Sequence, residues 1–216
     1  LTLHPIGTMQ VPSEITPEYG GRSADCPPPN PRLAAWWREL NRVGADFNGF
    51  DLTLETTHHG PWIETPSMFI EIGSTAVTWG HKRAAELLAG IIFRGLGLDG
   101  GDGLGEWDGT GQVVVTLGGG HYAPRANMLG MHSHVWIGHM LATYALPFER
   151  DESGKISGMW ENSIRKAIDA TKKGFPGGEI VCSMDKNAFK RWHRQAIRDL
   201  MEELGIPLLK SAQIIG

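Results

Sequence analysis

The sequence predicts an α/β domain in which helices pack against a mostly parallel β-sheet. Two observations carry this prediction. Short strand-like segments alternate along the chain with longer segments of helical periodicity, as is typical of α/β layers. Residues 112–117 are nearly all apolar and β-branched, as expected of a central strand buried on both faces. The 216 residues show no internal repeat or second core, so we expect a single domain over residues 1–216.

The composition excludes several classes of protein. With 41% hydrophobic and 20% charged residues, the chain is neither disordered nor a coiled coil. No run approaches the ~18 apolar residues of a membrane-spanning helix. Cys26 and Cys182 lie far apart, which indicates free thiols in a reducing compartment. Without a secretory signal we expect a cytoplasmic protein, and the initial Leu in place of Met leads us to expect a partial chain.

In the first half of the chain the sequence predicts a proline-rich arm followed by two helices and two strands. Prolines interrupt residues 1–30 too often for long regular structure. Apolar residues recur at helical spacing over residues 31–43, with proline in the first turn. Residues 50–57 alternate with a period of two and predict a strand, and a second short strand covers residues 68–72. A helix follows over residues 75–94, with a threonine as its N-cap.

The second half begins with a glycine-rich segment. Eight glycines and four acidic residues fall within residues 95–111, which we interpret as a flexible surface insertion. The central strand then ends at a Gly-Gly-Gly-His run. A strand is predicted over residues 135–137 and a helix over residues 162–173. A further strand over 179–183, a helix over 187–204 and a short terminal strand over 206–209 complete the pattern.

Histidines gather where predicted strands end. His58 and His59 follow one strand, His121 follows another, and His139 closes a third. Because strand ends converge at one edge of a parallel sheet, these imidazoles can meet in space. Glu71 lies between isoleucines, where a buried carboxylate needs a partner or a metal. Such a set suits Zn²⁺, yet no His-Glu-x-x-His motif is present, so hydrogen-bonded turn residues and a buried ion pair remain alternatives.

Other catalytic signatures are missing from the sequence. The three glycines at residues 118–120 allow a tight turn or close approach to a ligand, but they match neither a phosphate loop nor a dinucleotide fingerprint. No serine lies in a Gly-x-Ser-x-Gly elbow.

Charge is distributed unevenly. The net charge is −4, yet residues 155–198 contain ten basic and four acidic residues. This segment could bind a polyanion or form a solvated helix face.

Several motifs together resemble one known family. These are Glu-Thr-Thr-His-His-Gly-Pro at 55–61, Phe-Ile-Glu-Ile-Gly-Ser-Thr at 69–75, Gly-Gly-Gly-His-Tyr-Ala-Pro-Arg at 118–125, and Gly-His at 138–139 followed by Tyr144. The order and content resemble the archaeal and plant type of D-aminoacyl-tRNA deacylase, the family of the plant Gekko ethanol-tolerance protein. The opening residues 1–7 and residues 175–179 resemble the plant branch.

The resemblance implies a fold, a reaction and a cofactor. The fold would be a three-layer α/β/α sandwich with a mixed sheet, similar to phosphorylase/hydrolase proteins. The reaction would be hydrolysis of the ester between a D-amino acid and tRNA, including aldehyde-modified D-aminoacyl-tRNA, as chiral proofreading. One or two Zn²⁺ ions would assist the attack of water on the carbonyl.

The resemblance also implies roles for individual residues. The implied metal ligands are His58, His59, His121, His139 and Glu71, of which Glu71, His59 and His121 would also be catalytic. The implied substrate-binding residues are His4, Gly119, Gly120, Tyr122 and Arg125. Within the basic segment, the expected tRNA-binding residues are Lys172, Lys173, Lys190, Arg191 and Arg194.

Two departures from the family pattern stand out. Where relatives carry an acidic run, this chain has Ala76 and Val77; we expect those acids to stabilise a helix N-terminus rather than to act in catalysis. An N-terminal region of the family is also expected to be absent. Two alternatives use the same histidines. One is a zinc amidohydrolase or peptidase on a related fold, and the other is a non-catalytic RNA-binding protein with a structural zinc.

Overall fold

The centre of the molecule is a parallel sheet. The structure is a computed structural model that describes residues 1–12, 14–73 and 75–216. Strand β4 (Gln112–Leu117) lies between β5 (Val135–Leu141) and β8 (Glu179–Met184), and both pairings are parallel. The pairing of β4 with β8 is continuous from Gln112 to Leu117, whereas the pairing with β5 shifts its register between Val114 and Thr116. The predicted bounds of the central strand are therefore confirmed.

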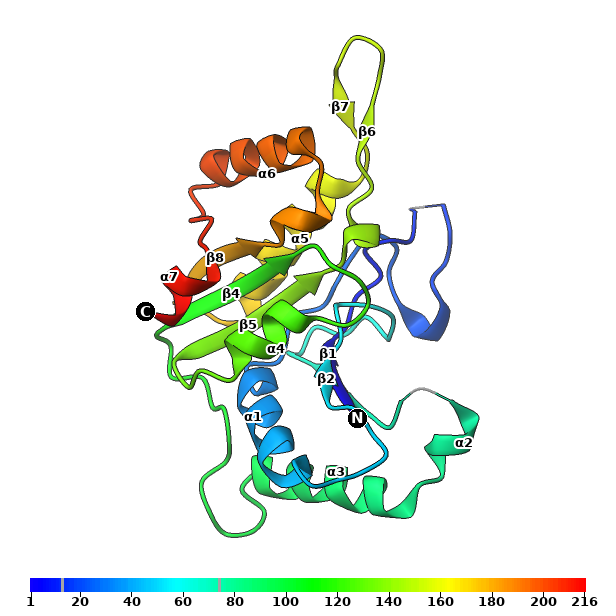
Figure 1. Cartoon of the computed structure of the whole chain (residues 1–216), viewed down its shortest axis with the longest axis vertical. Coiled ribbons are helices and arrows are strands. Elements are labelled where there is room, and N and C mark those ends of the chain that lie inside the picture. Colours follow the sequence, from blue (N-terminus) through cyan, green and yellow to red (C-terminus); the bar gives the residue numbers. More distant parts are fainter. Residues whose placement is uncertain (13, 74) are drawn as a thin grey trace.

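Helices cover both faces of this sheet (Figure 1). The alternating side chains of β4 explain why: Val113 and Val115 belong to one buried cluster, and Val114 belongs to the other. The first cluster includes buried residues of α5 (Trp160–Gly174) and α6 (Arg191–Glu203). The second includes residues of α1 (Leu33–Gly44), α3 (Lys82–Gly95), α4 (Pro124–Gly130) and α7 (Ser211–Ile215). The three-layer α/β/α sandwich is thus confirmed.

A second sheet adjoins β5 through the start of the chain. Strand β1 (Thr2–Pro5) pairs in parallel with β2 (Thr53–Leu54) and in antiparallel with β3 (Met68–Glu71). The protein therefore contains the expected mixed pairing. The expectation of an irregular arm over residues 1–30 is wrong at its start, because residues 1–9 are buried and residues 2–5 form a central strand.

Several element boundaries differ from the sequence expectation. The expected helix over residues 75–94 is two helices, α2 (Ala76–Trp79) and α3, separated at Gly80 and His81. The His81 ring accepts a hydrogen bond from the Ala84 N–H and so caps α3. The last long helix begins at Arg191, after a short 3₁₀ turn. The terminal strand is a single bridge between Cys182 and Leu208.

Residues 53–57 join the two sheets. Beyond β2, Glu55 bridges Tyr122, the Thr56 N–H donates to the His121 carbonyl (2.8 Å), and the Thr57 N–H donates to the Met140 carbonyl (2.7 Å). The strand expected over residues 50–57 is therefore short as a ladder, because its second half bonds to the loop after β4 and to β5. These bonds bring residues 58–59 beside the carboxyl edge of the parallel sheet.

The glycine-rich insertion is anchored to the body. Arg32 donates hydrogen bonds of 2.8 Å to the carbonyls of Gly95 and Leu104. Trp107 packs edge-on against Trp136, with ring centroids 5.0 Å apart. By contrast, the hairpin of β6 (Glu149–Arg150) and β7 (Ile156–Ser157) projects from the body (Figure 1).

Two further sequence expectations concern the thiols and the membrane. Cys26 and Cys182 are free and buried, and burial raises the pKa of the Cys182 thiol to about 12. Within the described residues, no helix has the length and apolarity to cross a bilayer.

Candidate metal and active site

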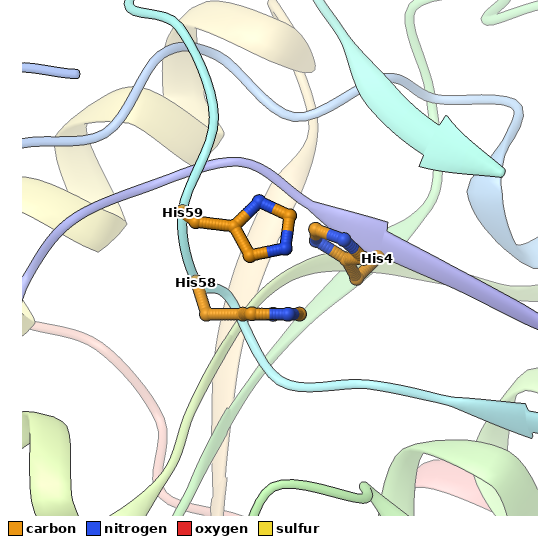
Figure 2. Close-up of side chains that lie close together, drawn as sticks. All are labelled: His4, His58 and His59. Atoms are coloured by element: carbon orange, nitrogen blue, oxygen red, sulfur yellow. The ribbon is translucent and has the colours of Figure 1, made fainter. Parts of the chain in front are cut away.

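Four imidazoles meet where the two sheets join. His4 comes from β1, His58 and His59 come from the segment after β2, and His121 comes from the loop after β4. The centroid of the His58 ring lies 4.0 Å from that of His4, 4.2 Å from that of His59 and 4.4 Å from that of His121. Figure 2 shows the His4 and His59 rings side by side, with His58 beneath them.

Two carboxylates face this His cluster (His4, His58, His59 and His121). An oxygen of Glu71 lies 3.3 Å from His4 Nε2 and 3.9 Å from His59 Nε2. Its hydrogen bond with His4 lowers the pKa of Glu71, so the group stays ionised.

Glu55 is the second carboxylate and is nearly buried. One of its oxygens lies 3.5 Å from both His58 Nε2 and His121 Nε2. Burial raises the pKa of Glu55, while His121 and His4 oppose that shift. Sequence reasoning did not select Glu55, although an acid that precedes a His-His pair in an apolar strand was a usable signal.

Backbone carbonyls determine which imidazole nitrogens face the carboxylates. The Nδ1–H of His58 donates to the Thr56 carbonyl at 2.7 Å, and that of His4 donates to the Pro5 carbonyl at 2.9 Å. Nε2 of each ring is therefore the atom that faces a carboxylate. Burial lowers the pKa of His58 to about 3 and also lowers that of His59. Neutral His58 thus directs a lone pair at Glu55.

A lone pair that faces a carboxylate is repulsive unless a proton or a metal cation lies between the two groups. Three overlapping groups of side chains have ligand atoms within 4.8 Å of one another: His4, His58 and His59; Glu55, His58 and His121; and His4, Glu55 and Glu71. Imidazole nitrogen and carboxylate oxygen are the donors that Zn²⁺ accepts. Carbonyl bonds to the opposite ring nitrogens are typical of metal-binding histidines. The donor set therefore fits zinc.

His139 does not join the cluster, contrary to its expected placement. Strand β5 continues to Leu141, so His139 lies within the strand rather than at its end. Its Nδ1 lies 3.0 Å from the Thr57 hydroxyl, and its Nε2 lies 3.0 Å from the Pro27 carbonyl. Both nitrogens are occupied and the ring is fully buried, which lowers its pKa to about 4. We therefore leave His139 out of the proposed ligand set.

A pocket of about 440 Å³ opens beside Glu55. Its wall includes Phe50, Asp51, Thr53, Gly73, Thr75, Thr78 and the exposed ring of Tyr122. Ser74, which belongs to the second motif, lies outside the described residues. His59 and His121 remain 40% and 41% exposed, so the cluster is accessible from outside.

The glycine loop after β4 supports the position of His121. Gly118 and Gly119 have φ values of 97° and 95°, which glycine adopts without strain. A Cβ on Gly118 would lie 2.6 Å from the Phe189 ring, whereas Gly119 and Gly120 have open space around them. Open glycines beside His121 leave room for a ligand against the backbone.

The structure separates the expected tRNA-binding residues into two groups. Lys190, Arg191 and Arg194 lie at the start of α6, which follows the carboxyl end of β8. Lys172 and Lys173 lie in the last turn of α5, which precedes the beginning of β8. The two groups therefore lie towards opposite ends of the strands.

Known proteins provide an independent comparison. A family model described as D-aminoacyl-tRNA deacylase matches residues 1–209. The D-aminoacyl-tRNA deacylase of Arabidopsis thaliana is 39% identical over 220 residues, which cover 95% of this chain and 69% of the relative. That of Pyrococcus horikoshii is 32% identical over 173 residues, covering 80% of this chain and 54% of the relative.

A solved structure has the same fold. The crystal structure of a conserved protein of unknown function, AF0625, matches with a TM-score of 0.73 and 26% identity, covering 99% of this chain and 66% of that one. This chain therefore spans only part of its relatives' length, about two thirds for the plant protein and about half for the archaeal one. The match over residues 1–209 agrees with the resemblance drawn from the motifs, and the chain belongs to the D-aminoacyl-tRNA deacylase family.

Proposed function

We propose that this protein hydrolyses the ester bond of D-aminoacyl-tRNA at the His cluster. The observation that carries the proposal is the pair of carboxylates, Glu55 and Glu71, that face imidazole Nε2 atoms beside an open pocket. The names of the plant and archaeal relatives supply the substrate class.

We place zinc among the residues that face one another across the cluster. His4, His58, His121, Glu55 and Glu71 supply the ligand atoms, with His59 beside them. A bound zinc ion would polarise the ester carbonyl and favour ionisation of water near neutral pH. The number of ions, one or two, depends on how many of the three overlapping groups are filled.

His59 and Glu71 carry the proton transfer in this proposal. His59 is neutral near pH 7 because its pKa is lowered, and its ring is partly exposed. It takes a proton from the attacking water, and ionised Glu71 stabilises the imidazolium that forms. The new carbon–oxygen bond leads to cleavage of the ester, and His59 returns the proton to the ribose oxygen. The products are a free D-amino acid and tRNA with a free hydroxyl.

The surroundings suit the two parts of the substrate. The pocket beside Glu55 has room for an amino-acid side chain, including an amino group that carries an aldehyde-derived substituent. Nδ1 of His121 lies 3.4 Å from the Tyr144 hydroxyl, which orients the ring so that its Nε2 faces Glu55 and the proposed metal position. Tyr122 is exposed and provides a surface on which the terminal adenine can stack.

The test compares D-tyrosyl-tRNA with L-tyrosyl-tRNA, with and without a zinc chelator. We expect D-selective cleavage that the chelator removes and zinc restores. His59→Gln should lower kcat by about 10²- to 10⁴-fold, whereas the control His132→Gln should retain wild-type activity because His132 lies outside the cluster. Equal cleavage of both isomers would refute proofreading, and chelator-resistant cleavage would refute the metal. Cleavage of small amides alone would support a zinc amidohydrolase.

A further inference from the structure

Two cavities at the carboxyl edge of the sheet share one arginine. The first, of about 440 Å³, lies where α4, the end of β8 and the start of α7 meet. The second, of about 680 Å³, lies along α6 beside the β6–β7 hairpin. Arg198 of α6 lines both of them, so the two cavities adjoin at this side chain, and we name their combined lining the Arg198 track.

The Arg198 track is strongly basic. Its basic side chains are Arg125, Lys186, Arg198 and Lys210 in the first cavity and Arg150, Arg191 and Arg194 in the second. Among the described residues that line it, Asp185 is the one acidic side chain, and it pairs with Arg125 at 3.6 Å. Such an excess of positive charge in a concave surface attracts a polyanion.

Helix α6 presents its arginines in a row. Arg191, Arg194 and Arg198 are three and four residues apart, which places them on one face of the helix. Seven residues of helix span about 10 Å, a length comparable with a few nucleotides of one strand. Trp192 lies in the same groove, with Arg150 5.8 Å from its ring, and arginine beside an aromatic ring is typical of surfaces that bind nucleic acids.

One donor in the first cavity lacks a partner. Arg125 donates to the Ser211 hydroxyl at 2.8 Å and pairs with Asp185. Its Nε–H is buried, and the described part of the protein provides no acceptor for it. An unsatisfied buried donor is unfavourable, and an anionic oxygen bound in this cavity would supply the acceptor that the Arg125 Nε–H lacks.

The Arg198 track begins close in sequence to the His cluster. Arg125 follows His121 by four residues, and Tyr122 lines the pocket beside Glu55. From Arg125 the track leads past the end of β8 to the outer face of α6. We propose that the Arg198 track binds the sugar–phosphate backbone of the tRNA acceptor strand and so holds the 3′ end at the His cluster. This inference rests on the proposed function and defines where its substrate docks.

Lys172 and Lys173 fall outside the Arg198 track. Helix α5 begins at the carboxyl edge, where Trp160 stacks on Phe148 at 4.6 Å, and it ends about 20 Å further along its axis. The sequence alone grouped these lysines with Lys190, Arg191 and Arg194. Replacing Lys172 and Lys173 is therefore a matched control for replacing two arginines of the track, because it removes the same charge from a different part of the surface.

The experiment measures binding of uncharged tRNA by fluorescence anisotropy at several KCl concentrations. For Arg191→Gln/Arg198→Gln we expect at least tenfold weaker binding at 0.1 M KCl and a log K against log[KCl] slope that is less steep by about 1.5. Lys172→Gln/Lys173→Gln should bind like the wild type. Equal losses in both variants, or no loss in the arginine variant, would overturn the proposal. Thermal unfolding verifies that both variants are folded.

A kinetic measurement separates this proposal from the proposed function. Two substrates are compared: D-tyrosyl-tRNA and the D-tyrosyl ester of adenosine, which lacks phosphate. In the arginine variant, kcat/KM for the tRNA substrate should fall at least tenfold relative to kcat/KM for the adenosine ester. The change should lie in KM. An unchanged ratio would contradict the track. Absence of cleavage of either substrate would refute the proposed function, whereas tRNA binding would still decide whether the track exists.

Discussion

Protonation of His139 should make the protein sensitive to mild acid. The hydrogen bonds around this ring determine its tautomer. The Pro27 carbonyl can only accept, so His139 Nε2 donates and Nδ1 is left to accept from the Thr57 hydroxyl. The Thr57 oxygen in turn accepts the Met140 N–H at 3.1 Å. A proton added to Nδ1 would face the Thr57 hydroxyl hydrogen in the protein interior, so the hydrogen bond between these two groups would be lost.

The magnitude follows from the difference in pKa. His139 has a pKa of about 4 in the folded protein, against 6.5 ordinarily, so the unfolded chain takes up the proton first as the pH falls. The stability that neutral His139 supports is complete above pH 6.5 and is lost between pH 6.5 and 4. The loss is about 2 kcal/mol at pH 5 and levels off at roughly 3 kcal/mol below pH 4.

Urea unfolding at pH 8 and pH 5, in the presence of a chelator, measures this loss. His139→Gln removes the titrating group and keeps an amide that can donate to Pro27 and accept from Thr57. The wild type should lose about 2 kcal/mol more than this variant between the two pH values. Because other buried groups titrate equally in both proteins, the difference isolates His139. Equal losses would refute the reasoning, and altered zinc content in His139→Gln would return His139 to the ligand set.

Four further predictions concern packing and the metal. Gly138→Ala should destabilise the protein by about 1–3 kcal/mol in urea unfolding, because the new Cβ would clash with Thr171 Cγ2. Gly90→Ala, in the middle of α3 with nothing within 4 Å, should instead stabilise it by up to about 1 kcal/mol; destabilisation there would contradict the reasoning. Glu55→Gln should weaken zinc retention at least tenfold in competition with a chromogenic chelator, whereas the exposed control Glu106→Gln should not change it. Zinc at 100 times its Kd should add about 2.7 kcal/mol to the free energy of unfolding, and an unchanged melting temperature would exclude a site formed by folding.

Local pattern was sufficient for the layers of the fold. The apolar, β-branched run over residues 112–117 predicts a strand that is covered on both faces, and this prediction depends little on the rest of the sequence. Helix α1 likewise follows from its apolar spacing and differs from the predicted span by about two residues. Strand-end histidines indicated three of the four imidazoles in the His cluster, but His58 and His59 follow β2 of the second sheet and meet His121 because the backbone of residues 56–57 bonds to the parallel sheet and its loop.

Contacts between distant segments decided the remainder. The proline-rich opening was expected to be largely irregular, yet residues 2–5 become a central strand because β2 and β3 satisfy their backbone from both sides. That pairing places His4 in the His cluster, with its ring centroid 4.0 Å from that of His58, and Glu55 lies 3.5 Å from both His58 and His121.

The sequence by itself therefore determined the class of fold, the family and the kinds of side chain at the site, because these depend on local periodicity and short motifs. Only the tertiary structure decided which nitrogen atoms face the carboxylates, that His139 bonds to Thr57 and Pro27, and that the basic residues divide between two ends of the strands. Such relations depend on pairing across more than 60 residues, on which periodicity along the chain carries no information.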